Sequence, residues 1–447
     1  MARATPARLA AAQVLGDVRR RDARARDVLR GSSRMRDLDE RDRAFASRLV
    51  LGVVGALGML DAVIDQHLSR PRLEPKVRDA LRLASFELLF LSTPAQVAVS
   101  QGVELVRGVR PRAAGMANAV LRRVAERDVP RRTLALERVR AREGSVEDLS
   151  LVSGYPAWLL ERVWRERGQE AARDLACSAP EPAPVFVAAN LARCSAQEAH
   201  DLLARKGLSP RAAQVEGSFV LDAPATLATS GLVDDAAVVV ADLSAQQVAD
   251  LAAPEPGMRV LEVGQGRGTK TILLQSRALR AGGPAMVVGI DSEAFKVDVS
   301  RQRMSRAGLA QGVRSLVFDA CELDSSELPP VLRDPFDLVF VDAPCSGTGT
   351  LRRHPEIAWR LVERDVTQLA QLQARMLAAA STRVRAGGRL CYATCSILRE
   401  ENQDVVSLFL DSAAGRAFDM DGEPFVSHPS PQGPDGHFCA CFVRRSE

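Results

Sequence analysis

The chain contains 447 residues, too many for one ordinary hydrophobic core, and its length suggests about three domains of about 150 residues each. With 46% hydrophobic and 26% charged residues, the composition is that of a globular protein. No apolar run approaches the roughly 20 residues of a membrane span, and residues 1–6 lack the apolar region of a signal peptide. We therefore expect a cytoplasmic protein, neither embedded in a membrane nor secreted.

The formal net charge of +4 conceals an uneven distribution along the chain. Residues 1–150 contain 29 Lys and Arg against 19 Asp and Glu, a net charge of +10, whereas residues 151–447 carry −6. This split indicates a polyanionic partner for the N-terminal part. A solvated, arginine-rich helical surface explains the same charge equally well.

The first 130 residues show the periodicity of helices throughout. Thr5 and Pro6 read as an N-cap followed by proline at the first helical position, and Thr93 and Pro94 open a second such segment. Residues 45–60 and 77–91 repeat apolar side chains at helical spacing. We predict an all-α bundle over residues 1–130.

A charged connection is expected at residues 128–149, and a helix begins near Tyr155. Beyond it, residues 185–189 read as a strand, 195–206 as a helix and 218–221 as another strand. These elements predict a small α/β subdomain over residues 150–235.

A glycine-rich turn opens the C-terminal part, predicted as a third domain over residues 236–447. The strand at 259–263 leads into residues 264–271, which read GQGRGTKT, and a helix follows. Glycines at alternate positions are commoner in sites for S-adenosyl-L-methionine than in dinucleotide sites, which favour GxGxxG. The next strands end in Asp291, placed to bind ribose hydroxyls, and Asp319, placed to accept from the adenine amino group.

Two cysteine motifs follow two further apolar strands. Residues 342–349 read DAPCSGTG after the strand at 338–341, and residues 392–396 read YATCS after the strand at 389–392. Parallel strands deliver such turns to one edge of a sheet, where ligands bind. Cys345 and Cys395 at that edge suggest nucleophilic catalysis beside a cofactor, although most cysteines are simply buried, inert thiols.

The other cysteines give no local pattern. Neither a CxxC pair nor a repeated spacing occurs, which predicts reduced thiols and no disulfide or zinc framework. Cys439 and Cys441 can be read as half a metal site, but a strand over 438–443 is the better interpretation. We therefore expect no bound metal.

The helical part resembles the NusB-like RNA-binding domain. The resemblance lies in residues 115–124 (GMANAVLRRV), 41–45 (RDRAF), 49–53 (LVLGV) and 81–89 (LRLASFELL). It implies RNA binding through the basic surface of the bundle, and the alternative is a purely structural docking or dimerisation domain.

The C-terminal part resembles the RNA cytosine-5 methyltransferases (the NOL/NOP/Sun family), and the whole chain resembles their RsmB type, which acts on small-subunit ribosomal RNA. The cysteine motifs carry the resemblance, together with residues 352–359 (RRHPEIAW) and 400–402 (EEN). It implies a Rossmann-like class I methyltransferase domain, S-adenosylmethionine as cofactor and RNA as partner. The chain is expected to act as a monomer.

The resemblance also implies roles for individual residues. Cys395 is then the nucleophile that attacks carbon 6 of cytosine, Cys345 assists elimination, and Asp342 holds the cytosine edge. Lys270 is then expected near Asp342 or near the carboxylate of the cofactor. The implied RNA-backbone contacts are Arg352, Arg353 and His354. The cofactor-binding candidates are Gly264, Gln265, Gly266, Arg267, Gly268, Thr269, Lys270, Asp291, Asp319 and Asp342.

The glycine loop departs from the family's CAAPGGKT pattern, because Arg267 replaces the proline and the second glycine is lost. One alternative is therefore a non-catalytic RNA-binding or antitermination-like scaffold. The presence of both Cys345 and Cys395 argues against it. A nicotinamide-dependent dehydrogenase is disfavoured by the glycine spacing and has no use for paired thiols. A methyltransferase acting on an exocyclic amino group requires an aromatic residue near the position of Cys345.

Overall fold

The computed structural model describes residues 4–70 and 72–446. Residues 1–3, which belong to the predicted helical domain and to the segment read as lacking a signal peptide, lie outside the described residues. The chain forms two compact units, Met1–Ala183 with Thr350–Val362, and Pro184–Gly349 with Glu363–Glu447. We call them the helical unit and the sheet unit. The domain boundaries at residues 130, 150 and 235 stay predictions.

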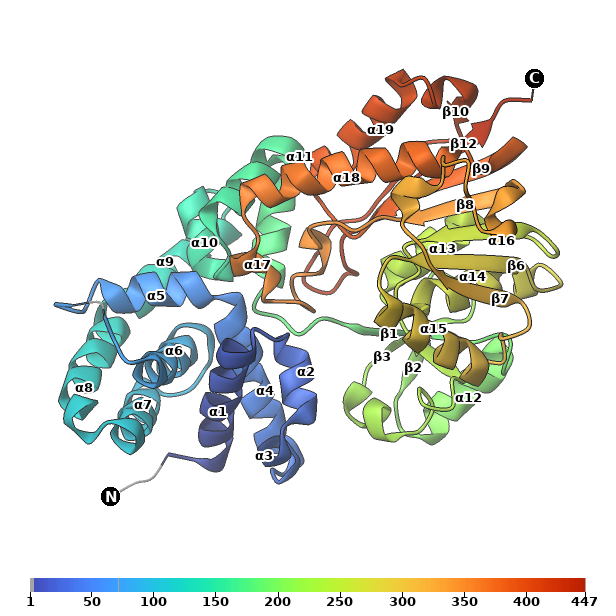
Figure 1. Cartoon of the computed structure of the whole chain (residues 1–447). Coiled ribbons are helices and arrows are strands. Elements are labelled where there is room, and N and C mark those ends of the chain that lie inside the picture. Colours follow the sequence, from blue (N-terminus) through green and yellow to red (C-terminus); the bar gives the residue numbers. More distant parts are fainter. Residues whose placement is uncertain (1–3, 71, 447) are drawn as a thin grey trace. The chain divides into compact units, whose positions relative to one another are not determined.

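The predicted all-α bundle is confirmed in the helical unit (Figure 1). Its central helix α6 (Pro75–Phe90) packs on α1 (Pro6–Arg21), α4 (Glu40–Gly55), α5 (Leu57–Asp65) and α7 (Ala95–Val109). The other helices are α2 (Ala25–Gly31), α3 (Ser33–Arg36), α8 (Ala114–Arg123), α9 (Val129–Arg140), α10 (Val146–Ser153), α11 (Ala157–Ser178) and α17 (Ile357–Arg360). A short 3-10 helix at Pro111–Ala113 and a π-helix at Val124–Asp128 adjoin α8.

A buried carboxylate in the bundle is paired with an arginine. Glu87 of α6 is almost fully buried, and its Oε2 accepts a hydrogen bond of 2.9 Å from Nε of Arg8 in α1. Pairing offsets the cost of burying each charge. No single described helix is long and apolar enough to cross a membrane, although the consecutive helices α4 and α5, bent by 78°, together meet the length and composition test.

The charged connection predicted at residues 128–149 is wrong, because the segment forms α9 and the start of α10. Ala135 and Val139, four residues apart, are buried on one face of α9. Arg132 turns its guanidinium inward and donates to the carbonyl oxygens of Leu89, Leu151 and Val152. Burial lowers the pKa of Arg132 to about 10. Because a charged side chain lies in the interior here, the pattern of polar and apolar residues along the segment does not indicate a helix.

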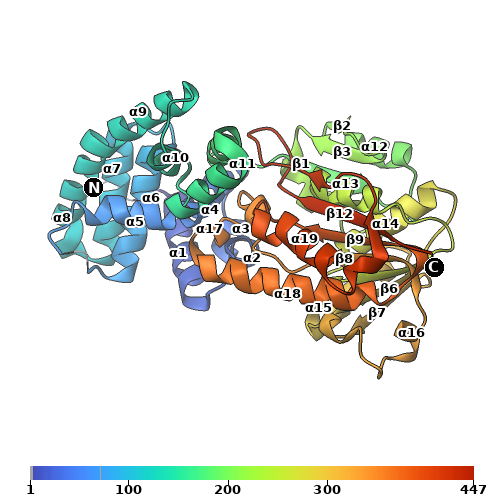
Figure 2. The ribbon, with the colours of Figure 1, turned by 90° about the horizontal axis from the view of Figure 1, so that it is seen from above.

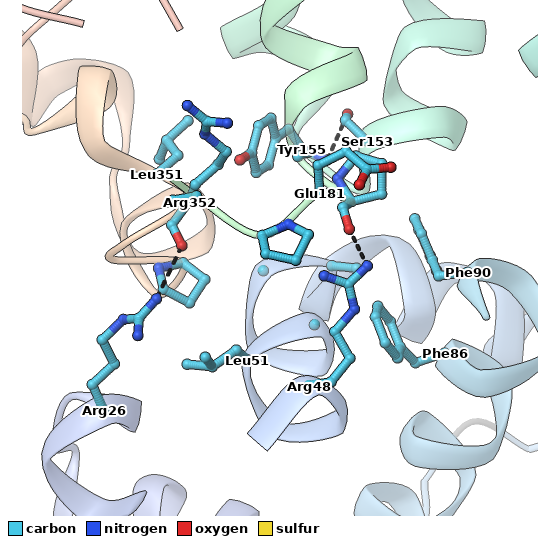
Figure 3. Close-up of a pocket in the computed structure, with 18 of the residues that line it drawn as sticks. Arg26, Arg48, Leu51, Phe86, Phe90, Ser153, Tyr155, Glu181, Leu351 and Arg352 are labelled. Atoms are coloured by element: carbon cyan, nitrogen blue, oxygen red, sulfur yellow. Dashed lines mark hydrogen bonds between the residues drawn. The ribbon is translucent and has the colours of Figure 1, made fainter. Parts of the chain in front are cut away.

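The segment Thr350–Val362 belongs to the helical unit although its flanking residues belong to the sheet unit. Trp359 Nε1 donates to the carbonyl oxygens of Gly55 (2.9 Å) and Gly154 (3.1 Å). A Cβ on Gly58 would lie 2.2 Å from the Trp359 ring, so the glycine is needed for this approach. Arg26 donates to the main-chain oxygen of Arg352 (Figure 3) and to that of Arg353.

The sheet unit contains a small sheet with strand order β2-β3-β1-β4, which confirms the predicted small α/β subdomain as part of the fold. Its strands are β1 (Val185–Ala189), β2 (Pro210–Ala212), β3 (Ser218–Leu221) and β4 (Val238–Val240). Helix α12 (Ala196–Arg205) begins at a capping box, in which Ser195 and Glu198 bond each other's main chain.

The large sheet has the order β10-β12-β9-β8-β5-β6-β7, with β11 paired to β12, and it confirms the Rossmann-like expectation. Strands β9, β8, β5, β6 and β7 are parallel, and β12 is antiparallel to β9. The strands are β5 (Arg259–Val263), β6 (Met286–Asp291), β7 (Val313–Val317), β8 (Phe336–Asp342), β9 (Val384–Thr394), β10 (Phe418–Met420), β11 (Phe425–Val426) and β12 (Phe438–Arg444).

Helices cover both faces of this sheet (Figure 2). One core gathers buried residues of α13, α14 and α15, and the other gathers those of α18 and α19. The helices are α13 (Leu243–Ala252), α14 (Thr269–Arg280), α15 (Ala294–Arg306), α16 (Pro330–Arg333), α18 (Glu363–Ser381) and α19 (Gln403–Asp411). Strand order reverses between β5 and β8, and ligands of such sheets bind at this switch point.

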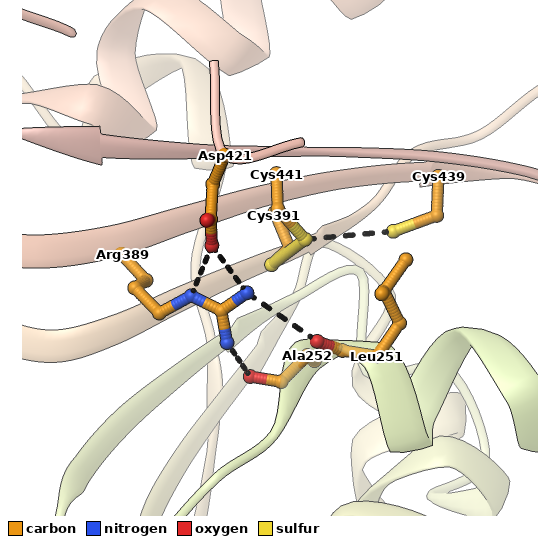
Figure 4. The surroundings of a disulfide bond; sticks show 7 residues. All are labelled: Leu251, Ala252, Arg389, Cys391, Asp421, Cys439 and Cys441. Atoms are coloured by element: carbon orange, nitrogen blue, oxygen red, sulfur yellow. Dashed lines mark hydrogen bonds and ion pairs between the residues drawn. A yellow bond between two sulfur atoms is a disulfide. The ribbon is translucent and has the colours of Figure 1, made fainter. Parts of the chain in front are cut away.

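The prediction that every cysteine is reduced is wrong for one pair. Cys391 of β9 and Cys441 of β12 form a disulfide (Figure 4). The two residues lie directly opposite each other in the antiparallel ladder, with their Cα atoms 4.2 Å apart. They are 50 residues apart in the chain, so only strand pairing brings them together. Cys439 and Cys441 lie in the predicted strand, which is confirmed.

The structure predicts that Trp359 stabilises the helical unit. Trp359→Ala should lower the free energy of unfolding by about 2–3 kcal/mol, because a partly buried indole and two hydrogen bonds are lost. Urea unfolding measures this change. Leu134→Ala is the control, since Leu134 is 54% exposed in the same unit and its truncation should cost less than about 0.5 kcal/mol. Equal, small effects of both changes would contradict the anchoring role.

Candidate active site

The glycine loop joins β5 to α14 at the switch point of the sheet. Gly264, Gly266 and Gly268 all have positive φ, of 77°, 57° and 77°. The amides of Gly264 and Gln265 donate to the carbonyl oxygen of Ile290, which ties the loop to the end of β6. Because all three glycines adopt left-handed conformations, the alternate spacing follows from the path of the backbone.

A Cβ on Gly264 would lie 2.2 Å from the carbonyl oxygen of Asp342, so the loop passes directly against the end of β8. A Cβ on Gly266, by contrast, meets nothing closer than 3.9 Å. The loop is therefore tight toward the sheet and open at Gly266. Such an open, glycine-lined backbone before a helix N-terminus fits a small ligand.

Three buried side chains lie beneath the loop. Gln265 is 3% exposed, and its Nε2 donates to Thr271 Oγ1, which in turn donates to Glu262 Oε2 over 2.6 Å. Burial raises the pKa of Glu262 to about 8. Gln265 is among the predicted cofactor-binding residues, but its side chain is engaged inside the protein and its amide donates to the carbonyl oxygen of Ile290.

The two predicted aspartates follow β6 and β7. Asp291 accepts from the amides of Gly266 (3.0 Å) and Glu293 (2.9 Å), and Lys296 Nζ lies 3.7 Å from its Oδ1. Asp319 accepts from the amide of Cys321 (2.9 Å). Both carboxylates stand at the same edge as the glycine loop, and Asp291 is bonded to the loop itself.

Arg267 and Thr269 complete the predicted loop residues. The Arg267 guanidinium lies 5.8 Å from the centre of the exposed Phe295 ring. Arg303 donates to the Arg267 carbonyl oxygen (3.0 Å) and to Thr269 Oγ1 (2.8 Å). Arg303 thus holds the outer side of the loop, where the family pattern has proline.

The two predicted thiols meet at the ends of β8 and β9. The sulfur atoms of Cys345 and Cys395 lie 3.3 Å apart. The hydrogen bond to Cys395, burial and the charges of Cys395 and Glu401 raise the pKa of Cys345 well above its ordinary value. Adjacent parallel strands thus bring together two residues 50 positions apart.

An ion pair stands beside the thiols. Lys270 Nζ lies 2.8 Å from Asp342 Oδ2, as the resemblance had suggested for these two residues. Burial lowers the pKa of Lys270, but Asp342 and the charges of both thiols outweigh it, so the net shift is upward. Lys270 therefore stays protonated, and its positive charge favours a thiolate nearby.

Three buried polar residues that hold these turns were missing from the predicted site. Gln373 of α18 donates to the Pro344 carbonyl oxygen (2.9 Å), and Asn402 donates to that of Ser396 (2.9 Å). Glu401 accepts from the Ser346 amide (2.7 Å). The sequence indicates residues 400–402 only as part of a family motif. It does not indicate Gln373, because a single polar residue in an apolar helix face resembles a surface position.

The predicted RNA contacts Arg352, Arg353 and His354 lie in the helical unit, whereas the cysteines lie in the sheet unit. Arg352 lines a cavity of about 350 Å³ in the helical unit together with Arg26, Arg48 and one carboxylate, Glu181 (Figure 3). Burial and the neighbouring arginines lower the pKa of His354 to about 4, so its ring is neutral at pH 7.

The sheet unit thus combines an open glycine loop, a carboxylate bonded to that loop, a lysine–aspartate pair and two thiols in contact. A thiolate beside a cation can add to an electrophilic carbon, and its neighbour can exchange a proton with the adduct. The described residues contain no cluster of three or more His, Cys, Asp or Glu side chains that could hold a metal ion.

Comparison with known proteins finds two family matches. Residues 249–423 match the family described as 16S rRNA methyltransferase RsmB/F, and residues 5–126 match the NusB family. The chain is 32% identical to ribosomal RNA small subunit methyltransferase B of Xanthomonas campestris over 98% of this chain and 97% of that protein. It is 28% identical to the protein of the same name from Salmonella typhi, over 91% of both.

Solved structures share the fold. The crystal structure of PH0851 superimposes with a TM-score of 0.78 at 22% identity and covers 98% of both chains. The structure of NSun6 from Pyrococcus horikoshii with SFG covers 66% of this chain and all of that one, with a TM-score of 0.56 at 15% identity. At these identities the likeness concerns the architecture alone.

Gly264→Ala should disrupt the glycine loop. Two effects combine, a positive φ that costs about 1 kcal/mol and a Cβ that collides with the Asp342 carbonyl, so we expect a loss of at least about 3 kcal/mol in unfolding free energy. Gly257→Ala is a matched control, with the same φ of 77° but no atom within 4 Å of the added Cβ. Equal urea-unfolding results for the two variants would contradict the close approach.

The buried Glu262 should make the stability depend on pH. Its pKa is raised to about 8 in the folded protein, so the folded state binds an extra proton between about pH 5 and 8, and stability falls as the pH rises through that window. The slope is at most about 1.4 kcal/mol per pH unit. Glu262→Gln should flatten the curve in urea unfolding at pH 5, 6.5 and 8, whereas Glu255→Gln, an exposed control, should leave it unchanged. Parallel curves for wild type and Glu262→Gln would refute the shift.

Proposed function

Since the chain belongs to the RsmB/F family of 16S rRNA methyltransferases, we propose that it methylates carbon 5 of a cytosine in small-subunit ribosomal RNA through a thiol adduct at carbon 6. It is an S-adenosylmethionine-dependent rRNA methyltransferase, so the scaffold and dehydrogenase alternatives fall away. The observation that carries the proposal is the contact of 3.3 Å between Cys345 and Cys395 beside the Lys270–Asp342 pair.

The cofactor fits the glycine loop. Gly266 leaves room for a ligand, while Gly264 and Gly268 let the loop pass close to the protein behind it. Asp291 presents a carboxylate at the adjacent strand end, where ribose hydroxyls bind in this type of fold. Asp319 follows the next strand along. Arg267, Thr269 and the charge of Lys270 complete the proposed cradle, and Gln265 contributes by holding the loop in place. When bound, S-adenosylmethionine supplies an electrophilic methyl group on a sulfonium ion.

Cys395 is proposed as the nucleophile. Carbon 5 of cytosine reacts poorly until a nucleophile adds to carbon 6, and the thiolate of Cys395 forms that bond, which leaves an enamine with electron density at carbon 5. Asp342, which pairs with Lys270, is proposed to bond the cytosine edge and stabilise this form. The base must leave its stack to reach the thiols.

Cys345 is proposed to assist the second half of the reaction. After carbon 5 has gained the methyl group, its proton must leave before the Cys395–carbon 6 bond can break. The sulfur of Cys345 lies beside that of Cys395, so it is within reach of the same base. Its electron pair takes the proton, the carbon 5–carbon 6 double bond returns, and Cys395 departs as a thiolate.

The helical unit is proposed to bind the RNA. Residues 1–150 carry a net charge of +10, which favours a polyanion. Arg352, Arg353 and His354 lie on a segment that follows the Cys345 motif in the chain, and Arg352 lines the arginine-rich cavity. We further propose a monomer that uses no metal or membrane and works in the cytoplasm, where bacterial ribosomes are assembled.

Two cysteine variants test this chemistry. Cys395→Ala should reduce methyl transfer to a small-subunit rRNA transcript by about 10³-fold or more without weakening RNA binding, because the adduct cannot form. Cys345→Ala should still form the adduct and accumulate it as a protein–RNA species that resists denaturation. Tritium transfer and denaturing gels measure both outcomes. Wild-type turnover by Cys395→Ala would exclude it as the nucleophile.

A further inference from the structure

A fully buried carboxylate connects the two cysteine turns. Glu401 is 0% exposed, and its Oε1 accepts from the amide of Ser346 (2.7 Å). Its Oε2 accepts from the hydroxyls of Ser346 and Ser396, each at 2.5 Å. These serines directly follow Cys345 and Cys395 in the chain. One side chain therefore holds both residues that come after the thiols.

Further buried groups fix the carboxylate itself. Gln373 Nε2 donates both to Glu401 Oε1 (3.1 Å) and to the Pro344 carbonyl oxygen (2.9 Å). The Tyr392 hydroxyl donates to the Glu401 main-chain oxygen (2.6 Å). The hydrogen bonds that reach the buried carboxylate of Glu401 from these groups come from neutral donors. A charge in such surroundings acts strongly on titratable neighbours.

We propose that Glu401 is a positioning residue that clamps the two cysteine turns together and, through its charge, makes Cys345 a stronger base for removal of the carbon 5 proton. This inference rests on the proposed function, because it assigns a role within that reaction. It adds a residue that contacts neither the substrate nor the cofactor in the proposed mechanism.

The charges around Cys345 support the direction of this effect. The Cys395 hydrogen bond, burial, the Cys395 charge and the Glu401 charge all raise the Cys345 pKa, and the Gly347 amide lowers it. Lys270 on α14 opposes the two anions and is itself paired with Asp342 on β8. Tyr392 on β9 stays neutral, since burial and the charges of Cys345 and Glu401 raise its pKa well above the ordinary value.

The effect of Cys395 on the pKa of Cys345 changes during the reaction, whereas the effect of Glu401 does not. When the Cys395 sulfur bonds to carbon 6, its negative charge disappears, and the largest cause of the raised Cys345 pKa disappears with it. Cys345 can then release its proton to water. The carboxylate of Glu401 stays in place, and its charge keeps the Cys345 thiolate basic enough to accept the proton from carbon 5.

Single-turnover kinetics test the proposal. The full-length enzyme is mixed with S-adenosylmethionine and a small-subunit rRNA transcript, quenched rapidly in denaturant at pH 6 to 10, and assayed for formation and decay of the protein–RNA adduct. Glu401→Gln keeps the shape of the side chain and removes the charge. The pH midpoint of adduct decay should fall by about one unit. The plateau rate should fall about three-fold, as expected for a base weakened by one pKa unit.

A second variant separates the charge from the clamp. Ser346→Ala removes one donor to Glu401 but keeps its charge, so adduct formation and decay should both slow while the midpoint does not fall. Asp404→Asn, an exposed carboxylate paired with Arg399 just beyond the same turn, serves as control and should behave as wild type. Circular dichroism and calorimetric cofactor binding establish that each variant is folded.

The outcomes distinguish the inference from the proposed function. An unchanged decay midpoint in Glu401→Gln, with normal folding, would overturn the role of the charge. Unchanged rates in Ser346→Ala and Glu401→Gln together would overturn the clamp. If the wild-type enzyme formed no adduct at any pH, the proposed covalent mechanism itself would fail. That result differs from an unchanged midpoint and from unchanged rates in the variants.

Discussion

The parallel pairing of β8 with β9 is the constraint on which the active site depends. Asp342 lies opposite Ala393 in this ladder, so the turns that follow the two strands emerge side by side and their sulfur atoms meet at 3.3 Å. Neither turn carries a paired thiol by itself. Because β5 borders β8 on the other side, the same edge also receives the glycine loop, whose backbone passes directly against the Asp342 carbonyl.

Buried polar groups maintain this arrangement. Hydrophobic contacts hold strands and helices together, but they are non-directional and do not define the positions of two sulfur atoms to a fraction of an ångström. Hydrogen bonds to Glu401, Gln373 and Asn402 supply that direction. Burying a carboxylate is costly unless its lone pairs are satisfied, and Glu401 meets this condition with bonds to the two cysteine turns.

The helical unit also contains a segment of chain that comes directly after the Cys345 motif. Residues 350–362 follow the Cys345 motif almost immediately, and Trp359 and Arg26 fasten them within the helical bundle. The bundle therefore holds a segment of chain only a few residues from a proposed catalytic thiol. The backbone therefore leads directly from the Cys345 motif into the unit for which we propose RNA binding.

The sequence by itself determined the element types, the family and the proposed catalytic thiols, because apolar periodicity, strand-end glycines and the two cysteine motifs are local in the chain. The sequence did not reveal the helix α9, because Arg132 turns inward and interrupts the polar pattern. It did not reveal the disulfide between Cys391 and Cys441, because only the strand register places these two residues opposite each other. Tertiary structure alone decided that Glu401 and Gln373 hold the thiol turns and that residues 350–362 pack in the helical unit. These features join positions far apart in the chain, and burial and hydrogen bonding at such positions leave no periodic pattern in a sequence.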